Sequence, residues 1–428
     1  MAVRRMPVWA LSFALFLTGL LAEPQAKDSP PELSLPEGYV WHEPEAVAQV
    51  EGEVTDAHVT CDEEGAVHLV WIAERQSIHC AVRTDEGWQP AETVAESKTR
   101  RTKLAAARVA ARGGEVWVVH RRDLRSGRSE IVASRRTPEG WGEPETLSES
   151  KVTLLPPTVH IDADGQPQVY WFVLIPPPSI VRNVEHELYV RRHGPEGWGA
   201  ETKVLEPTVN ITSPTIEFNR QDQVHMAWFV LFREAGTGVK DLTTPQHYSF
   251  IHRMTSGQAG ALRPSSRGPF IIMAPGQATL VATIDRDGYW HGLARAHPVF
   301  IGKQQDQFFH ITNRGGAWPT DVKPVAIRPG RSTGTLLAGS LGERGVLLAW
   351  QEGTTLHGFL VEDGEQKPEW SVPIEGEAVS GAGAEDGRFH LVATQTGRRG
   401  KKWIAELLYY RLSPADTSEG ASAQTPAQ

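Results

Sequence analysis

Short apolar runs recur along this chain, and Gly, Pro or Asp bounds each of them. A typical unit has an apolar strand, an acidic turn ending in Gly, a second apolar strand ending in Trp and, after a third strand, a Gly-Trp pair. The first copy starts at His58, turns at Gly65, reaches Trp71 and continues to Gly87-Trp88. Runs of about four to eight residues between such turns predict antiparallel β-strands.

The turn before the second strand marks seven copies of this unit, at Gly65, Gly114, Gly165, Asp222, Gly288, Arg344 and Gly387. Self-similarity at a period of roughly 40–50 residues is typical of propellers and solenoids. The copies at Arg344 and Gly387 are degenerate. We therefore predict an all-β protein, a single seven-bladed β-propeller of four-stranded antiparallel blades. Six blades are the alternative, if the copy at Arg344 is only an insertion.

The two ends of the repeat region complement each other. Residues 41–47 match the outer-strand pattern of residues 141–147, yet they stand before the first full unit. The last unit has a third strand at Trp403 to Leu412 and no fourth, because the chain is polar from Ser413 onward. We predict that the N-terminal strand completes the last blade. This pairing would close the ring and cover sheet edges that would otherwise promote aggregation.

The N-terminus has the pattern of an export signal. Arg4 and Arg5 precede an apolar run from Val8 to Leu21, which is short for a bilayer span, and residues 1–22 therefore predict a signal peptide. An uncleaved anchor is the alternative. Residues 23–37 form a Pro-rich and acidic spacer, residues 38–412 the propeller, and residues 413–428 a polar tail expected to be disordered. We expect a secreted or periplasmic protein without a transmembrane helix after cleavage.

Composition excludes one class of partner. The chain has 428 residues, 40% of them hydrophobic and 22% charged, which is usual for a soluble globular protein. Its net charge of −9 argues against a general nucleic-acid binder, which needs a basic surface. Basic residues cluster from Arg121 to Arg128, where a solvated loop explains them. We expect a monomer that binds no nucleic acid.

The two cysteines are predicted to be unpaired. Cys61 falls on the first strand of its blade and Cys80 on the third. With the second strand between them, strand spacing places their backbones roughly 9–10 Å apart, whereas a disulfide needs about 4.4–6.8 Å. We therefore predict two buried free thiols.

Strand order predicts which face of the ring binds a ligand. The acidic turns and the Gly-Trp corners share one face and are short. The opposite face carries long irregular segments in blades 3 to 5, and such loops are usually functional. Guanidinium groups near this rim suit carboxylate, sulfate or phosphate, with surface charge as the alternative. The candidate ligand-binding residues are Arg121, Arg182, Arg233 and Arg295.

Two positions in the first strands are candidates for chemistry. His160 and Glu217 each lie five residues before the turn marker, in adjacent blades. A Glu in an apolar strand is costly unless it is paired. Glu217 and His160 are therefore catalytic candidates, as general acid or base, or hydrogen-bonding groups for a ligand. The alternative is a structural polar contact in a wet channel.

Recurring His and Asp residues have a structural explanation. The His residues of the second strands are distributed around the ring, so they cannot converge on one metal, and a packing role is predicted for His68, His225, His291 and His390. The turns from Asp162 and from Asp285 could coordinate calcium, but Asp side chains that fold back on the backbone explain them without a metal. No cofactor is expected, and calcium is the one alternative.

The units resemble secreted β-propellers of the broad sialidase-like (BNR-repeat-like) group. Residues 161–165 (Ile-Asp-Ala-Asp-Gly), Tyr170-Trp171 and Gly197-Trp198, with their counterparts, carry this resemblance over about residues 40–412. The resemblance is architectural, because the sialidase box Ser-x-Asp-x-Gly-x-Thr-Trp is absent. No nucleophile pair or arginine triad of the group can be matched to residues of this chain.

Two functions follow from the sequence. The first is an exported propeller that binds a glycan or protein ligand, without catalysis, on the face carrying the long loops of blades 2–5. The alternative is a carbohydrate-active enzyme, a sialidase-like glycoside hydrolase or a polysaccharide lyase, that uses Glu217 and His160. A structural role in the cell envelope is the third. A Glu217 that is open to a funnel would favour the enzyme, and one sealed between blades would argue against it.

Overall fold

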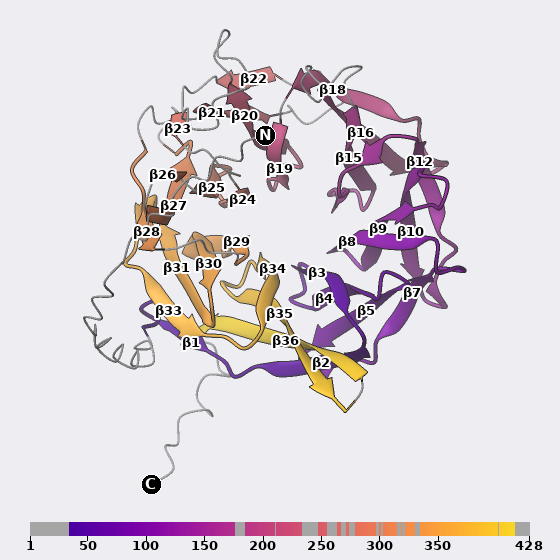
Figure 1. Ribbon diagram of the computed structural model, residues 1–428, viewed down its shortest axis with the longest axis horizontal. Coiled ribbons are helices and arrows are strands. Elements are labelled where there is room, and N and C mark those ends of the chain that lie inside the picture. Colours follow the sequence, from indigo (N-terminus) through magenta and orange to yellow (C-terminus); the bar gives the residue numbers. More distant parts are fainter. Residues whose placement is uncertain are drawn as a thin grey trace, which may run out of the picture.

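The computed structural model describes residues 34–175, 185–209, 211–232, 247–254, 263–266, 271–273, 279–296, 299–300, 303–314, 318, 322–329, 334–400 and 402–415. Within these ranges the chain is built of strands, and the one helix is η1 (Gly342–Arg344), a single 3-10 turn. The prediction of an all-β protein is confirmed. Figure 1 shows the strands grouped into sheets that surround a central opening.

Three sheets come from the N-terminal half of the described chain. The first contains β3 (Val54–Cys61), β4 (Val67–Ala73), β5 (Ser77–Thr84), β6 (Gly87–Trp88) and β7 (Glu92–Glu96). The second contains β8 (Lys103–Arg112), β9 (Glu115–Asp123), β10 (Ser129–Thr137), β11 (Gly140–Trp141) and β12 (Glu145–Ser150). The third contains β13 (Thr153–Leu154), β14 (Thr158–Ile161), β15 (Pro167–Ile175), β16 (Glu185–Gly194), β17 (Gly197–Trp198) and β18 (Thr202–Val209).

Three more sheets continue the ring. The fourth contains β19 (Ile211–Phe218), β20 (Val224–Phe232), β21 (His247–Met254), β22 (Arg263–Ser266) and β23 (Ile271–Met273). The fifth contains β24 (Thr279–Ile284), β25 (Trp290–Ala296), β26 (Val299–Phe300), β27 (Lys303–Thr312) and β28 (Ala326–Pro329). The sixth contains β29 (Leu336–Ser340), β30 (Val346–Glu352), β31 (Thr355–Glu362), β32 (Glu365–Gln366) and β33 (Trp370–Pro373).

The seventh sheet unites the two ends of the described chain. It contains β34 (Glu377–Gly383), β35 (Phe389–Arg399) and β36 (Lys402–Pro414), together with β1 (Tyr39–Trp41) and β2 (Glu45–Glu51). Both N-terminal strands pair antiparallel with β36, and Trp41 lies opposite Leu412. The Trp41 ring stacks on Tyr410 at 5.4 Å. The N-terminal strand therefore supplies the outer edge of the last sheet.

The outer strand of most sheets is split at a tight corner. In the first three sheets a Gly-Trp pair forms the short piece, and the longer piece pairs further along the same third strand. The corner glycines Gly87, Gly140 and Gly197 have φ of 105°, 118° and 95°. Only Gly adopts such angles without a steric cost, which explains why Gly precedes each corner Trp.

Apolar contacts between neighbouring sheets hold the ring together. Seven core clusters occur in the described part of the chain, and each joins two adjacent sheets, including the seventh and the first. Four Trp residues of the second strands are buried in these clusters, each against the preceding sheet: Trp71, Trp171, Trp228 and Trp350. Burial of each such side chain stabilises the fold by about 1.5–3 kcal/mol.

The cysteines occupy the predicted strands. Cys61 lies in β3 and Cys80 in β5, with β4 between them, and both are free. Cys80 is buried, but Cys61 is only partly buried because it borders the central channel. Burial raises the pKa of both thiols to about 12, so both are unreactive at neutral pH. No helix in the described ranges has the length and apolarity of a membrane span.

Candidate functional site

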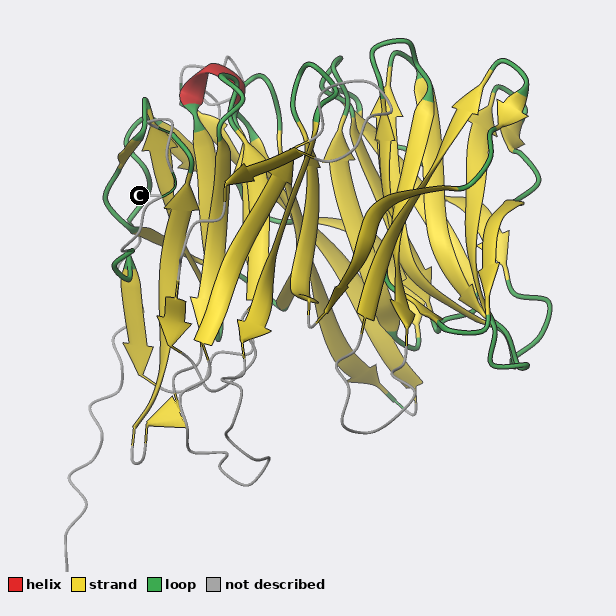
Figure 2. Ribbon diagram, turned by 90° about the horizontal axis from the view of Figure 1, so that it is seen from above, coloured by secondary structure: helices red, strands yellow, loops and turns green. Residues whose placement is uncertain are grey.

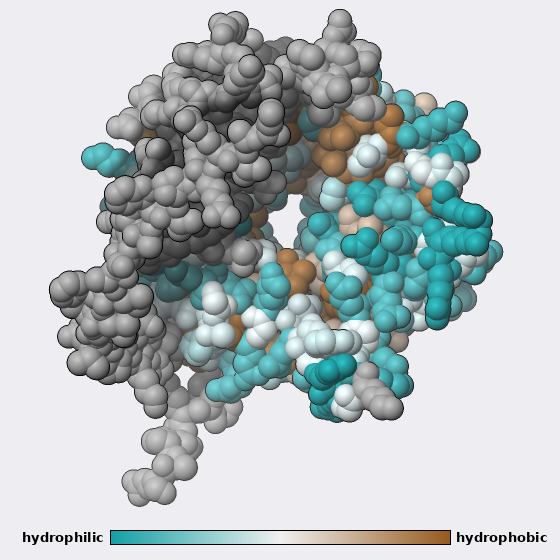
Figure 3. All heavy atoms as spheres, viewed as in Figure 1, coloured by the Kyte–Doolittle hydropathy of each residue, from teal (hydrophilic) through white to brown (hydrophobic). Residues whose placement is uncertain are grey.

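The innermost strand of every sheet faces a central channel. Segments of β3, β8, β14, β19, β24, β29 and β34 line a cavity of about 820 Å³. Figure 3 shows its opening at the centre of the molecular surface. Glu217 and His160 both line this cavity, so Glu217 is not sealed between blades. The structure thus brings the two predicted catalytic candidates into one space.

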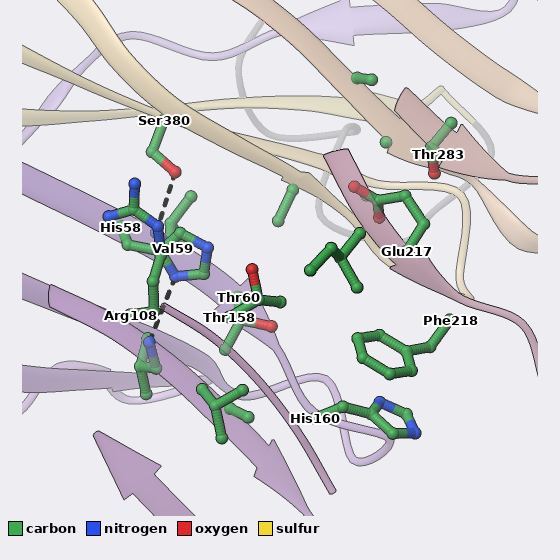
Figure 4. A pocket seen from close by; sticks show the side chains of 18 of the residues that line it. His58, Val59, Thr60, Arg108, Thr158, His160, Glu217, Phe218, Thr283 and Ser380 are labelled. Atoms are coloured by element: carbon green, nitrogen blue, oxygen red, sulfur yellow. Dashed lines mark hydrogen bonds between the residues drawn. The ribbon is translucent and has the colours of Figure 1, made fainter. Parts of the chain in front are cut away.

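A layer of equivalent positions surrounds the axis at the depth of these two residues. The layer consists of Thr60, Ala110, His160, Glu217, Thr283, Gly339 and Ala382. Each of these residues pairs with the same position of its second strand, the position that carries His68, His225, His291 and His390 in four of the sheets. Counting from the turn marker places Val109 in this layer, but Ala110 occupies it because the turn at Gly113-Gly114 has only two residues. Figure 4 shows Glu217 between Thr283 and the pair Phe218–His160.

Glu217 is an unpaired acid in this layer. Its side chain is partly exposed, and in the part of the chain that the structure describes no hydrogen bond or ion pair to its carboxyl is observed. Burial raises the pKa of Glu217 from its ordinary 4.5 to about 8. The carboxyl group therefore keeps its proton at neutral pH and can donate a hydrogen bond into the channel.

His160 is held from two sides. Its Nε2 lies 2.8 Å from Oδ1 of Asp222, and its ring stacks on Phe218 with centroids 4.0 Å apart and planes 3° from parallel. Burial lowers the pKa of His160 below its ordinary value, although Asp222 acts to raise it. His160 is therefore neutral at pH 7. Because the ionised Asp222 can only accept, Nε2–H donates, and Nδ1 keeps a free lone pair.

Asp222 connects three blades. Besides His160, it accepts hydrogen bonds from Arg112 Nη1 (3.0 Å) in the second sheet and from the backbone N–H of Ala163 (2.9 Å) in the third. Burial tends to raise the pKa of Asp222, but the bonds from Ala163 and His160 and the charge of Arg112 hold it below its ordinary value. Asp222 is thus a carboxylate that orients His160.

The backbone at Asp222 is unusual for a residue with a side chain. Its φ is 55°, in the left-handed region where other turns of the ring place Gly65, Gly165 and Gly288. Asp tolerates this region better than most residues, at some cost in free energy. Sequence reasoning passed over Asp222, yet the signal was visible: it stands at a turn marker where the clearest repeats have Gly.

Ion pairs join turns at this end of the channel. Arg112 Nε donates to Glu63 Oε1 at 2.9 Å, and Arg220 Nε of the fourth sheet donates to Glu385 Oε1 of the seventh at 3.3 Å. Arg286 also pairs with Glu343. The pairs Arg112–Asp222 and Arg220–Glu385 link sheets that are not neighbours, so they reach across the channel. They therefore narrow the channel at the end that carries the acidic turns. Figure 2 shows these short turns and η1 along one edge of the ring.

The predicted rim arginines that the structure describes tie blades together. Arg121 Nη1 donates to the carbonyl of Leu154 at 2.8 Å, and Arg295 Nη1 to the carbonyl of Gly334 at 2.5 Å. Gln351, at the same position of the sixth sheet, reaches the Gly376 carbonyl at 2.8 Å. None of these three side chains lines the channel cavity. Arg182 and Arg233 lie outside the described residues.

His residues of the second strands form hydrogen bonds with the Asp residues of the acidic turns. Nε2 of His68 lies 2.8 Å from Asp62 Oδ2, and Nε2 of His291 lies 3.1 Å from Asp285 Oδ2. The other oxygen of Asp62 accepts the backbone N–H of Ala66 at 2.8 Å. These contacts give the His and Asp repeats their structural role. In the described ranges, no group of three or more His, Cys, Asp or Glu side chains is arranged to hold a metal ion.

Comparison with known proteins reveals similarity of fold. No family model matches the sequence, and no curated protein matches it. The polysaccharide lyase Uly1 is similar in structure, with a TM-score of 0.52 and 10% identity over 82% of this chain and 89% of that chain. An ulvan lyase has a TM-score of 0.49 and 11% identity, covering 80% and 91% of the two chains.

A microbial sialidase is also among the similar structures. The microbial sialidase Hz136 has a TM-score of 0.41 and 11% identity, covering 86% of this chain and 66% of that chain. The architectural resemblance expected from the repeats is confirmed at the level of the fold by the similarity to Uly1. At these identities the similarity establishes the fold and leaves the activity to be argued from the site.

Proposed function

We propose that this protein is an exported seven-bladed β-propeller, closed by its N-terminal strands, that binds a glycan in its central channel. The observation that carries this proposal is the pair of uncharged, hydrogen-bonding groups at one depth. Glu217 keeps its proton and donates, while His160 Nδ1 accepts. Sugar hydroxyls both donate and accept, so a neutral donor beside a neutral acceptor suits them.

Hydroxyl side chains around this pair support the same ligand class. Thr60, Thr158, Thr283 and Ser380 also line the cavity. Each hydroxyl donates or accepts according to its partner, which fits the mixed pattern of a sugar ring. The ion pairs between turns narrow one end of the channel, so the ligand is proposed to enter from the opposite face. This is the face to which the sequence assigned the long loops of blades 2–5.

A glycan array followed by calorimetry tests this proposal. We expect Glu217→Ala to weaken binding of a glycan that the wild type binds by about tenfold, because a hydrogen-bond donor to a ligand hydroxyl is lost. Glu64→Gln is the matched control, since Glu64 is an exposed turn acid outside the cavity. Equal affinity of wild type and Glu217→Ala for every glycan would refute the channel site.

A carbohydrate-active enzyme is the second candidate, and the contact between His160 and Asp222 favours it. A carboxylate that orients a neutral imidazole is the arrangement of a general base, and protonated Glu217 is a suitable general acid. A hydrolase would need a second free carboxyl. Asp62, Glu63 and Glu385 are instead paired with His68, Arg112 and Arg220. Elimination by a lyase therefore fits this site better than hydrolysis.

Product formation separates the two candidates. The enzyme predicts that acidic polysaccharides are shortened and acquire the ultraviolet absorbance of an unsaturated sugar, and that His160→Gln abolishes this while binding remains. The binding function predicts no product from any glycan that binds. Arg121, Arg182, Arg233 and Arg295 stay predictions as ligand contacts, to be tested as alanine variants in the same binding assay.

A further inference from the structure

The face opposite the acidic turns carries several exposed cations. The first group lies at the tip of the β35–β36 hairpin, which extends past β2 in Figure 1 and presents Arg398, Arg399, Lys402 and Trp403. All four residues are exposed, and Trp403 is 56% exposed. The guanidinium of Arg398 lies 5.6 Å from the centre of the Trp403 ring. The hairpin thus combines cations with an exposed aromatic face.

Backbone hydrogen bonds connect this hairpin to the next blade. The N–H of Gly52 donates to the carbonyl of Trp403 at 2.8 Å, and the N–H of Glu74 donates to the carbonyl of Glu53 at 2.8 Å. Glu74 and Arg75 form the turn between β4 and β5. Arg75 is exposed, so exposed cations are found on the first sheet as well as on the seventh.

Further exposed cations lie on the segment that links the first sheet to the second. The N–H of Leu104 donates to the carbonyl of Arg75 at 2.9 Å, and Gln76 Nε2 donates to the carbonyl of Thr102 at 3.1 Å. These bonds seat the link against the turn. The link carries four exposed cations, Lys98, Arg100, Arg101 and Lys103.

These residues form what we call the basic strip: Arg398, Arg399, Lys402, Trp403, Arg75, Lys98, Arg100, Arg101 and Lys103. Among the described residues, Lys402 has an ion pair, with Glu51 at 2.7 Å, while the other cations of the strip have none. Further carboxylates along it are Glu53, Glu74, Glu96 and Asp123, which lies opposite Lys103 on the neighbouring strand. Cations outnumber acids here, in a chain whose net charge is −9. Local positive charge of this kind concentrates polyanions.

We propose that the basic strip binds an extended anionic polysaccharide, one bearing carboxylate or sulfate groups, and leads it to the open end of the channel. This rests on the proposed function. The link runs directly into β8, whose Arg108 lines the cavity and is itself paired with Asp56 at 3.0 Å. Unpaired guanidinium groups bind carboxylate and sulfate through two hydrogen bonds, and Trp403 offers a flat face to a sugar ring. The ligand class of the channel is then an acidic glycan.

The composition of the surface favours a glycan over a lipid membrane. A membrane-docking surface needs several apolar side chains that insert between lipids. In the described part of the chain, the exposed large hydrophobic residues are Trp403 and Ile327, and Ile327 lies in β28 on the fifth sheet. A single Trp among cations therefore fits a polar polymer better than a bilayer.

Binding of polygalacturonate to the mature protein, with neutral dextran of similar length as the comparison, tests the strip. We expect polygalacturonate to bind and dextran to bind at least about tenfold more weakly, with salt reducing the difference. The double variant Arg100→Glu/Arg101→Glu should lose about tenfold in affinity, and Trp403→Ala about threefold. Lys151→Glu is the matched control, since Lys151 is an exposed cation beside the next link. It should change affinity by less than about twofold.

Any one of three results would contradict the proposal that the strip binds an anionic polysaccharide. They are equal affinity for dextran and polygalacturonate, unchanged affinity of the double variant for polygalacturonate, and binding to phosphatidylglycerol vesicles but not to polygalacturonate. Short neutral oligosaccharides distinguish this failure from failure of the channel. If the strip alone is wrong, Glu217→Ala still weakens binding of short oligosaccharides. If the channel alone is wrong, Glu217→Ala binds them like wild type while polygalacturonate still depends on Arg100 and Arg101.

Discussion

The two ends of the channel use the same residue type in different ways. At the end that carries the acidic turns, Arg112 pairs with Glu63 and Asp222. The pair with Asp222 joins two sheets that are not neighbours. At the other end, Arg100 and Arg101 extend into solvent without an ion pair among the described residues. Arginine therefore serves assembly at one end and is available to a partner at the other.

The residue type alone therefore does not show whether a charged side chain stabilises the fold or binds a ligand. What matters is whether the side chain already has an ion pair or a hydrogen bond within the protein. Arg121 and Arg295 are predicted ligand contacts, and in the structure each donates to a carbonyl of the adjacent sheet. The two acids of the channel differ in the same way. Asp222 is paired and ionised, whereas Glu217 is unpaired among the described residues and keeps its proton.

Substitution of Asp222 is the most direct test of whether the ion pairs at the acidic-turn end stabilise the fold. We expect Asp222→Ala to lower the free energy of unfolding at pH 7 by about 3 kcal/mol, because Arg112 and His160 each lose a hydrogen-bond acceptor and Ala is strained at a φ of 55°. Denaturant unfolding measures it. Asp222→Gly removes the carboxylate without the strain and should cost less. If Asp222→Ala is as stable as wild type, the ion pairs at the turn end do not hold the ring together.

Arg295 sharpens the contrast between the paired and unpaired arginines. Arg295 is 8% exposed, and its removal leaves the Gly334 carbonyl without this donor, so Arg295→Ala should destabilise the protein by about 2 kcal/mol. Arg101→Ala is the control, because an exposed arginine without an ion pair should change stability by less than about 0.5 kcal/mol. Thermal unfolding of both variants gives the comparison. Equal losses of stability in the two variants would contradict the inference that Arg295 stabilises the fold whereas Arg101 does not.

The two acids should respond oppositely to pH. The folded pKa of Glu217, about 8, exceeds its ordinary 4.5, so its contribution to stability is present below pH 4.5 and is lost as pH rises through 8. Between pH 6 and pH 7 the wild type should therefore lose about 1 kcal/mol relative to Glu217→Gln.

Asp222 provides the matched control for this measurement. Its folded pKa is depressed, so its contribution is present above the ordinary pKa of 3.8 and is lost only as pH falls through the folded value. The stability difference between wild type and Asp222→Asn should stay constant from pH 6 to pH 7. A Glu217→Gln difference that is equally flat would show that Glu217 is ionised in the folded protein.

Much of the fold could be predicted because its signals are local. Gly-Trp corners, acidic turns and apolar strands recur, and each reports the backbone of a few neighbouring residues, such as the positive φ of Gly87. The site was predicted only in part. His160 and Glu217 were found because they interrupt an apolar strand. Arg112 and Asp222, in contrast, are 110 residues apart and meet only because the second and fourth sheets border the same channel.

The sequence by itself determined the strands, their order and the match between the first strand and the last blade, because strand periodicity and turn chemistry are written in consecutive residues. Only the tertiary structure decided which charges are neutralised. A guanidinium or carboxyl group has the character that its surroundings impose, and those surroundings come from blades distant in the chain. The proton on Glu217, the ionised Asp222 and the unpaired cations of the basic strip therefore became visible only once the sheets were in place.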